Sequence, residues 1–109
     1  MTNSKDTIAL TEAVFYILIS LKQPLHGYGI MQNVEQLSEG RVTLAAGTLY
    51  GAINTLLERR LIKASPGDSN TRKKEYEITE LGIKAVQEEL LRLKELIQNG
   101  NKFFGGVEK

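Results

Sequence analysis

The sequence lacks cysteine and tryptophan, and it has one histidine among its 109 residues. Without cysteine the chain can form no disulfide, offers no thiol nucleophile and supplies no thiolate metal ligand. The single histidine, His26, cannot form a histidine metal cluster, and a catalytic triad around it would lack supporting context. We therefore expect a protein that is not an enzyme and that needs no cofactor or metal.

Long apolar runs are also missing. The longest, Ala13 to Leu21, is too short to cross a bilayer, and residues 1–6 lack the apolar core of a signal peptide. We expect a cytoplasmic protein with no membrane contact. The chain has the size of one domain, and its hydrophobic content of 41% is close to the globular average, so we expect one ordered core.

Charge is unevenly distributed, although the formal net charge is only +1. Between Glu58 and Lys74 six basic residues stand against two acidic ones, whereas between Glu75 and Ile97 six acidic residues stand against three basic ones. The first stretch predicts a basic edge on the molecule, and the second predicts an acidic last helix.

Two segments carry more apolar surface than a small core requires. Residues 11–21 are apolar around nearly the whole helical circumference, which is typical of a helix covered on both sides. The last helix follows a good N-cap at Thr79 and repeats apolar residues at steps of 3, 4, 3 and 4, a heptad seam. The seam would suit packing within the chain or pairing with another copy, and the surplus face of the first helix favours a homodimer. The predicted interface residues are Val14, Phe15, Leu18, Ile83, Val86, Leu90, Leu93 and Ile97.

Two more helices are predicted between these segments. One covers residues 27–37, and Gly40 stands where a left-handed C-cap would end it. The other covers residues 45–59, with its N-cap near Thr43 or Leu44. The residues expected to face the core are Ile30, Met31, Val34 and Leu37 in the former and Leu49, Ala52, Ile53 and Leu56 in the latter.

A hairpin is predicted next, because the turn-forming residues 66–70 separate Leu61–Ile62 from the alternating stretch 74–78. The order helix, helix, helix, hairpin, helix is that of a winged helix with a C-terminal extension. We therefore predict a mainly α fold with a small β-hairpin. Its parts are a winged helix-turn-helix DNA-binding domain over residues 5–80, a dimerisation helix over residues 79–99 packed on the first helix, and a flexible tail over residues 100–109.

The outer face of the third helix combines glycine with small polar residues. Gly47 and Gly51 each cost about 1 kcal/mol of helix stability relative to alanine. Small residues would let the helix backbone approach phosphates in a DNA major groove, where Thr, Asn and Tyr side chains contact base edges or backbone oxygens. Alternatively, Gly47 merely sits in the first turn and Gly51 packs against a neighbouring helix.

The hairpin adds the cationic triplet Arg72–Lys74 behind a polar tip at residues 69–71. A basic wing of this kind grips phosphates or enters a minor groove, although such a triplet by itself is usually a solvated run. His26 and Tyr28 are further candidates for phosphate contact. The predicted DNA-binding residues are Tyr28, Gly47, Thr48, Tyr50, Gly51, Asn54, Thr55, Asn70, Thr71, Arg72, Lys73 and Lys74. In a dimer, two such surfaces would lie one helical turn of DNA apart, ~34 Å.

Three stretches in this order resemble the PadR-like family of winged-helix transcriptional regulators, and the likeness covers nearly the whole chain. They are Leu25-His26-Gly27-Tyr28-Gly29-Ile30, Gly47-Thr48-Leu49-Tyr50 and residues 72–82, RKKEYEITELG. The C-terminal part is similar to the small subgroup with one C-terminal helix. The resemblance implies a homodimer joined through the first and last helices, which binds palindromic operators and usually represses nearby genes. The residues that it assigns to DNA are Thr48 and Tyr50 in the third helix, Tyr28 near the DNA backbone, and Lys73 and Lys74 in the wing.

The same resemblance suggests a further partner. Some members of the family respond to aromatic or drug-like molecules, often through the dimer cavity, so a small aromatic effector is a candidate. The absence of tryptophan removes the flat ring that would suit a planar effector. The remaining lining candidates are Phe15, Tyr16, Phe103 and Phe104.

One departure from the family concerns the end of the third helix. Family members commonly carry a glutamate and then, three residues later, a glycine, where this chain has Leu57 and Arg60. Either Arg60 adopts a backbone conformation that glycine adopts more easily, or the helix ends differently.

A second function, of another class, also fits the pattern. The chain would then be a winged-helix protein-interaction module whose basic hairpin binds an acidic protein partner. Salt titration on duplex DNA separates the two, because a DNA-binding protein loses affinity steeply as salt rises.

Overall fold

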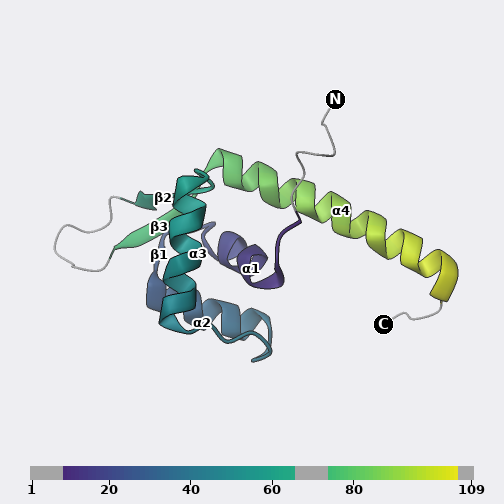
Figure 1. Cartoon of the computed structure of the whole chain (residues 1–109), viewed down its shortest axis with the longest axis horizontal. Coiled ribbons are helices and arrows are strands. Elements are labelled where there is room, and N and C mark those ends of the chain that lie inside the picture. Colours follow the sequence, from purple (N-terminus) through teal and green to yellow (C-terminus); the bar gives the residue numbers. More distant parts are fainter. Residues whose placement is uncertain (1–8, 66–73, 106–109) are drawn as a thin grey trace.

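The computed structural model describes residues 9–65 and 74–105, and its elements are shown in Figure 1. Over these residues the order is α1 (Glu12–Ser20), β1 (Leu25–His26), α2 (Gly27–Leu37), α3 (Ala46–Glu58), β2 (Ile62–Ser65), β3 (Glu75–Ile78) and α4 (Glu80–Phe104). The three strands form one antiparallel sheet in the order β1-β3-β2. The predicted fold, mainly α with a small sheet in a winged-helix arrangement, is confirmed.

The core lies between α1, α2, α3 and the sheet. Its fully buried side chains are Ile17, Leu18, Leu21, Ile30, Val34, Leu49, Ile53 and Ile62. The predicted core stripe of α3 is confirmed, since Leu49, Ile53 and Leu56 are buried and Ala52 packs against them. Leu37 was expected to face the core and is 44% exposed, because it lies in the last turn of α2, beyond the buried part of that helix.

Leu18 corrects the predicted interface. It has no exposed surface and belongs to the core of its own chain, so it is not available to a second copy. Apolar spacing on α1 could not separate a residue that faces its own core from one that faces a partner, because this helix is apolar on nearly all sides.

A third strand, β1, was not predicted. Leu25 lies opposite Tyr76 and His26 opposite Glu75, so two residues after Pro24 add an edge to the hairpin. Two residues are too few to show the alternation that marks a strand in sequence. Within the hairpin, Ile62 pairs with Ile78, and Tyr76 of the alternating stretch is buried.

Helices α2 and α3 end in the same hydrogen-bonded turn. At the end of α2, the Gly40 N–H donates to the Glu35 carbonyl at 2.8 Å and the Glu39 N–H donates to the Gln36 carbonyl at 3.1 Å. This is the Schellman arrangement, and its left-handed residue is Glu39, with φ 54°. The prediction that Gly40 would be the C-cap is therefore wrong by one residue, although Gly40 also has a left-handed φ of 81°.

The end of α3 repeats this turn with Arg60 in the left-handed position, at φ 63°. The Leu61 N–H donates to the Leu56 carbonyl and the Arg60 N–H to the Leu57 carbonyl, both at 3.0 Å. Arg60 therefore adopts the backbone conformation that glycine adopts more easily, which was the first of the two alternatives for this helix end. At its start α3 is capped by Ala45 without a side-chain hydrogen bond, and not by Thr43 or Leu44.

The last helix is longer than predicted. It begins after the expected N-cap Thr79 and continues to Phe104, so residues 100–104 of the predicted tail are helical. One glycine inside a helix costs about 1 kcal/mol, which is too little to stop a helix of 25 residues. Helix α4 contacts α1, and Figure 1 shows that the second half of α4 projects beyond the rest of the molecule.

Candidate nucleic-acid interface

The outer face of α3 is open. Its residues Gly47, Thr48, Gly51, Asn54 and Thr55 are all exposed. A Cβ atom added at either glycine would meet no described atom within 4 Å, so neither glycine is required by packing within the chain. The alternative that Gly51 packs against a neighbouring helix therefore does not hold for the described residues of a single chain.

Tyr50 lies at the edge of this face and contacts α2. A Cβ atom on Gly27, the first residue of α2, would come within 2.7 Å of Tyr50 Cζ, so only glycine allows the ring to lie there. Tyr50 remains 45% exposed. Burial raises the pKa of Tyr76 on β3, and the neighbouring Tyr50 adds to the rise. Tyr50 therefore joins α3 to α2 beside the sheet, a packing role that its sequence position did not indicate.

The start of α2 presents Tyr28 to solvent. Tyr28 is 61% exposed, whereas His26 caps the helix through Nδ1, which accepts a hydrogen bond from the Gly29 N–H at 3.3 Å. A helix start offers unpaired N–H groups and a positive end, which favour an anion such as a phosphate. His26 is thus used for capping, and Tyr28 is the exposed side chain at this end of the helix.

Part of the predicted wing cannot be placed. Asn70, Thr71, Arg72 and Lys73 lie outside the described residues, whereas Lys74 is exposed just before β3. On the strands themselves, Lys63 pairs with Glu77 at 3.4 Å, so this basic residue is partly neutralised.

The heptad seam of α4 divides into two rows. Ile83, Leu90 and Ile97 are 43%, 51% and 63% exposed, whereas Val86 and Leu93 are half-buried. The first row is therefore uncovered, and the second lies toward the rest of the chain. On α1, the predicted interface residues Val14 and Phe15 are half-buried.

A buried carboxylate on α4 was not anticipated from the sequence. Glu89 is 2% exposed and accepts two hydrogen bonds from Arg92, at 2.8 Å from Nε and 2.6 Å from Nη2. These bonds hold the pKa of Glu89 below its usual range against the opposing effect of burial, and the backbone N–H of Leu10 lowers it further. Glu89 therefore ties the segment before α1 to α4.

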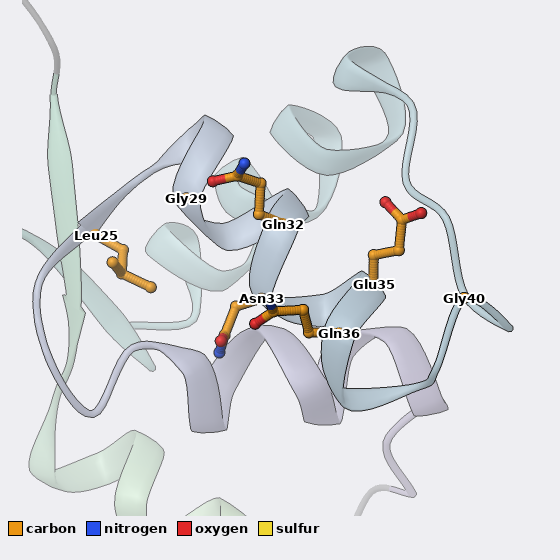
Figure 2. A pocket seen from close by; sticks show the side chains of 7 residues that line it. All are labelled: Leu25, Gly29, Gln32, Asn33, Glu35, Gln36 and Gly40. Carbon is orange, nitrogen blue, oxygen red and sulfur yellow. The ribbon is translucent and has the colours of Figure 1, made fainter.

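Among the described residues, two hollows could hold other molecules. Figure 2 shows a polar one of about 580 Å³ along α2, where Asn33 donates to the Ser20 hydroxyl at 2.8 Å. An apolar one of about 260 Å³ lies between α1 and α4. None of the predicted aromatic lining residues lines either hollow: Phe15 and Tyr16 stack edge to face with ring centres 6.3 Å apart, and Phe103 and Phe104 lie at the far end of α4.

The described part of the chain has neither a membrane-spanning helix nor a metal-binding cluster. No helix within residues 9–65 and 74–105 is long and apolar enough to cross a membrane. The same residues contain no group of three or more acidic or histidine side chains that could hold a metal ion.

Comparison with solved structures supports the winged-helix architecture. A transcriptional regulator from Clostridium thermocellum shares 24% identity at a TM-score of 0.69, covering 88% of this chain and 92% of that one. A PadR-like transcription factor from Bacteroides fragilis shares 26% identity at a TM-score of 0.67, covering 83% and 86%. BpsR from Bordetella bronchiseptica, whose DNA binding is regulated by 6-hydroxynicotinic acid, shares 23% identity at a TM-score of 0.65, covering 99% and 72%.

No curated protein sequence matches the chain. The model of the transcriptional regulator PadR-like family, however, matches residues 14–88, which include most of α1, the whole sheet, the open face of α3 and the first turns of α4. This match covers well over half of the chain and agrees with the resemblance seen in the sequence. The chain therefore belongs to the PadR-like family of DNA-binding transcriptional regulators.

Proposed function

We propose that the chain acts as a homodimer on a palindromic DNA operator and represses transcription there. In this proposal α3 enters the major groove, and the wing between β2 and β3 contacts the DNA backbone. The observation that carries the proposal is the open outer face of α3, which no other described part of the chain covers.

The two glycines on that face favour a DNA-binding role for it over no binding role. Gly47 and Gly51 together give up about 2 kcal/mol of helix propensity relative to alanine. Packing within the chain does not require them, since both would have room for a side chain. Close approach of the helix backbone to DNA supplies a reason, and Thr48 and Asn54 beside them offer hydrogen-bonding groups for base edges.

Groups suited to phosphate stand at the borders of the face. Tyr28 is exposed at the start of α2, and Arg59 and Arg60 are exposed at the end of α3. Contacts of this kind position a protein on DNA and supply much of its affinity, whereas the base contacts of α3 would supply specificity. Lys73 and Lys74 complete the proposed set in the wing.

The uncovered row on α4 supports the homodimer. Ile83, Leu90 and Ile97 form an exposed apolar stripe at heptad spacing, and Val14 and Phe15 of α1 are half-buried. A twofold pairing through this stripe would give two copies of α3, as a palindromic operator requires. By analogy with BpsR, we also propose that a small aromatic molecule releases the DNA, and that the regulator acts in the cytoplasm.

A salt titration tests the proposed function. Fragments selected from the source genome by the purified protein serve as labelled duplexes, and fluorescence anisotropy gives the Kd between 50 and 200 mM salt, a range over which phosphate contacts change affinity by orders of magnitude. Lys73→Ala should flatten the slope of log K against log salt by about one, because one phosphate contact is lost. Lys102→Ala, at the far end of α4, is the matched control and should leave the slope unchanged.

Failure of the proposal would have a clear form. A protein that binds neither the selected fragments nor its own upstream DNA at 50 mM salt, but binds an acidic protein, is an interaction module and not a regulator that reads DNA.

A further inference from the structure

The only histidine of the chain stands at the junction of β1 and α2. His26 is the last residue of β1 and the N-cap of α2, and it is half-buried. Its Nδ1 accepts a hydrogen bond from the Gly29 N–H at 3.3 Å. A backbone N–H can only donate, so Nδ1 carries no proton in this arrangement. The cap therefore requires the neutral imidazole, with its proton on Nε2.

Histidine is unusual as a cap. Thr11 and Thr79 cap α1 and α4 through hydroxyl oxygens, which accept a hydrogen bond in acid as well as at neutral pH, and α3 begins at Ala45 without a side-chain cap. Imidazoles, by contrast, change charge between about pH 5 and 8, and the charged ring donates from both nitrogens and accepts at neither. Among the described helices, α2 is thus the one whose cap is lost on protonation.

The turn that this cap holds lies against α3. The ring of Tyr50 packs on Gly27, the residue after the cap, so closely that a Cβ atom there would come within 2.7 Å of Tyr50 Cζ. Tyr28, the next residue, is 61% exposed. The first turn of α2 has no acidic residue that could offset the positive end of the helix in place of the cap. The cap thus holds the turn that carries Tyr28 and contacts α3.

A second partner for the ring stands across the sheet. Glu75 of β3 lies opposite His26 in the antiparallel register and is half-buried. Side chains opposite each other in such a pair have Cβ atoms about 4.5–5.5 Å apart, so a charged imidazole can reach this carboxylate. The other ionisable side chains on the elements that meet at His26 are Tyr28, Tyr50, Lys74 and Tyr76. Phenols carry no charge below about pH 8, and the one cation, Lys74, is exposed.

We propose that His26 positions the start of α2 for DNA binding only while its ring is neutral, so that operator binding weakens as the pH falls. This inference rests on the proposed function and adds a positioning residue that acts through the first turn of α2. Protonation places an Nδ1–H group against the Gly29 N–H and a positive charge at the positive end of the helix. The ring then leaves the cap for Glu75, and the Gly29 N–H loses its partner.

Operator affinity at two pH values tests the proposal. Anisotropy on a selected duplex at fixed ionic strength should give a wild-type Kd about fivefold higher at about pH 5.5 than at about pH 8, the effect of losing one N-cap. His26→Asn supplies a cap that does not titrate, so it should match the wild type at the higher pH and bind equally at both. His26→Ala should bind about fivefold more weakly than the wild type at the higher pH and show no pH dependence.

Two results would overturn the proposal. One is a pH dependence that His26→Asn shares with the wild type, since the histidine then does not cause it. The other is an affinity that rises in acid, which is the result expected if the charged ring touches a phosphate.

A measurement without DNA separates this inference from the proposed function. Nitrogen-15 NMR of the single imidazole reports whether Nδ1 carries a proton, and it should carry none in the free protein at about pH 8. At about pH 5.5 the Gly29 amide should exchange with solvent faster in the wild type than in His26→Asn. A proton on Nδ1 at the higher pH refutes the cap alone. A chain that binds no DNA at any pH refutes the proposed function, and with it the role of His26 in DNA binding.

Discussion

The Thr79 hydroxyl donates a hydrogen bond to the Arg60 carbonyl at 2.7 Å, and the same oxygen accepts from the Gly82 N–H at 3.0 Å. Thr79 thus caps α4 and also holds the left-handed turn that ends α3. The first turn of α4 packs tightly here, because a Cβ atom on Gly82 would come within 2.6 Å of Ile78 Cγ1. The end of α3, the base of the wing and the start of α4 are therefore joined at one point.

Thr79→Ala should lower the free energy of unfolding by about 1 to 2 kcal/mol, because it removes an N-cap and leaves the Arg60 carbonyl without this donor. Urea denaturation followed by circular dichroism measures the change. Thr79→Ser is the matched control and should keep most of the stability, since the hydroxyl remains. An unchanged midpoint for Thr79→Ala would show that the turn does not depend on this contact.

Arg60→Gly should raise the free energy of unfolding by about 0.5 to 1 kcal/mol. An L-residue pays about 1–2 kcal/mol in the left-handed region, and the larger entropy of glycine in the unfolded chain offsets part of the gain. Arg59→Gly, at the neighbouring right-handed position with φ −84°, should instead lower stability. Thermal unfolding of the two variants should therefore shift in opposite directions, and a shift in the same direction would contradict the assignment of strain to Arg60.

Gly51→Leu should separate stability from DNA binding. A leucine on this open helix face replaces the most flexible residue with a good helix former, so the free energy of unfolding should rise by up to about 1 kcal/mol. The same side chain would hold the α3 backbone away from DNA, so anisotropy on an operator fragment should show a loss of at least tenfold. Retained affinity in this more stable variant would argue against the major-groove docking of α3.

Leu90→Asp should abolish dimerisation without unfolding the chain. Leu90 is 51% exposed in one chain, so the charge is tolerated in a monomer, but it would be buried without a partner in the interface. Light scattering should then give the monomer mass, and operator affinity should fall. Leu91→Asp is the control, since it places the same charge one residue outside the seam. A dimer mass for Leu90→Asp would exclude this stripe from the interface.

Glu89→Gln should lower the free energy of unfolding at pH 7 by about 1 to 2 kcal/mol, because the charge-assisted bonds to Arg92 weaken. Since the folded pKa of Glu89 lies below its ordinary value of 4.5, its contribution is full above that value and is lost as pH falls through the folded pKa. The difference in stability between wild type and variant should therefore shrink as the pH of the denaturation curves is lowered from 7 toward 3. Glu88→Gln serves as control, and a difference independent of pH would rule out the ionised pair as the cause.

The sequence predicted where the helices lie more accurately than where they end. The 3.6-residue spacing of Leu49, Ile53 and Leu56 placed α3 correctly, because one buried face is enough to produce that pattern. The end of α2, by contrast, places Glu39 at a left-handed φ, which costs an L-residue about 1–2 kcal/mol. Residue propensity favours Gly40 for this position, so the sequence pattern pointed to the wrong residue.

The sequence by itself determined the fold class, the family and the open, glycine-bearing face of α3, because these follow from local periodicity and short motifs. Only the tertiary structure decided that Leu18 is buried in the core of its own chain, that Tyr50 packs on Gly27, and that Glu89 is buried against Arg92. These relationships join residues by three-dimensional proximity or by the exclusion of solvent, and neither leaves a repeating signal along the chain. The apolar hollow beside α4 belongs to the same class, since its walls come from three separate elements.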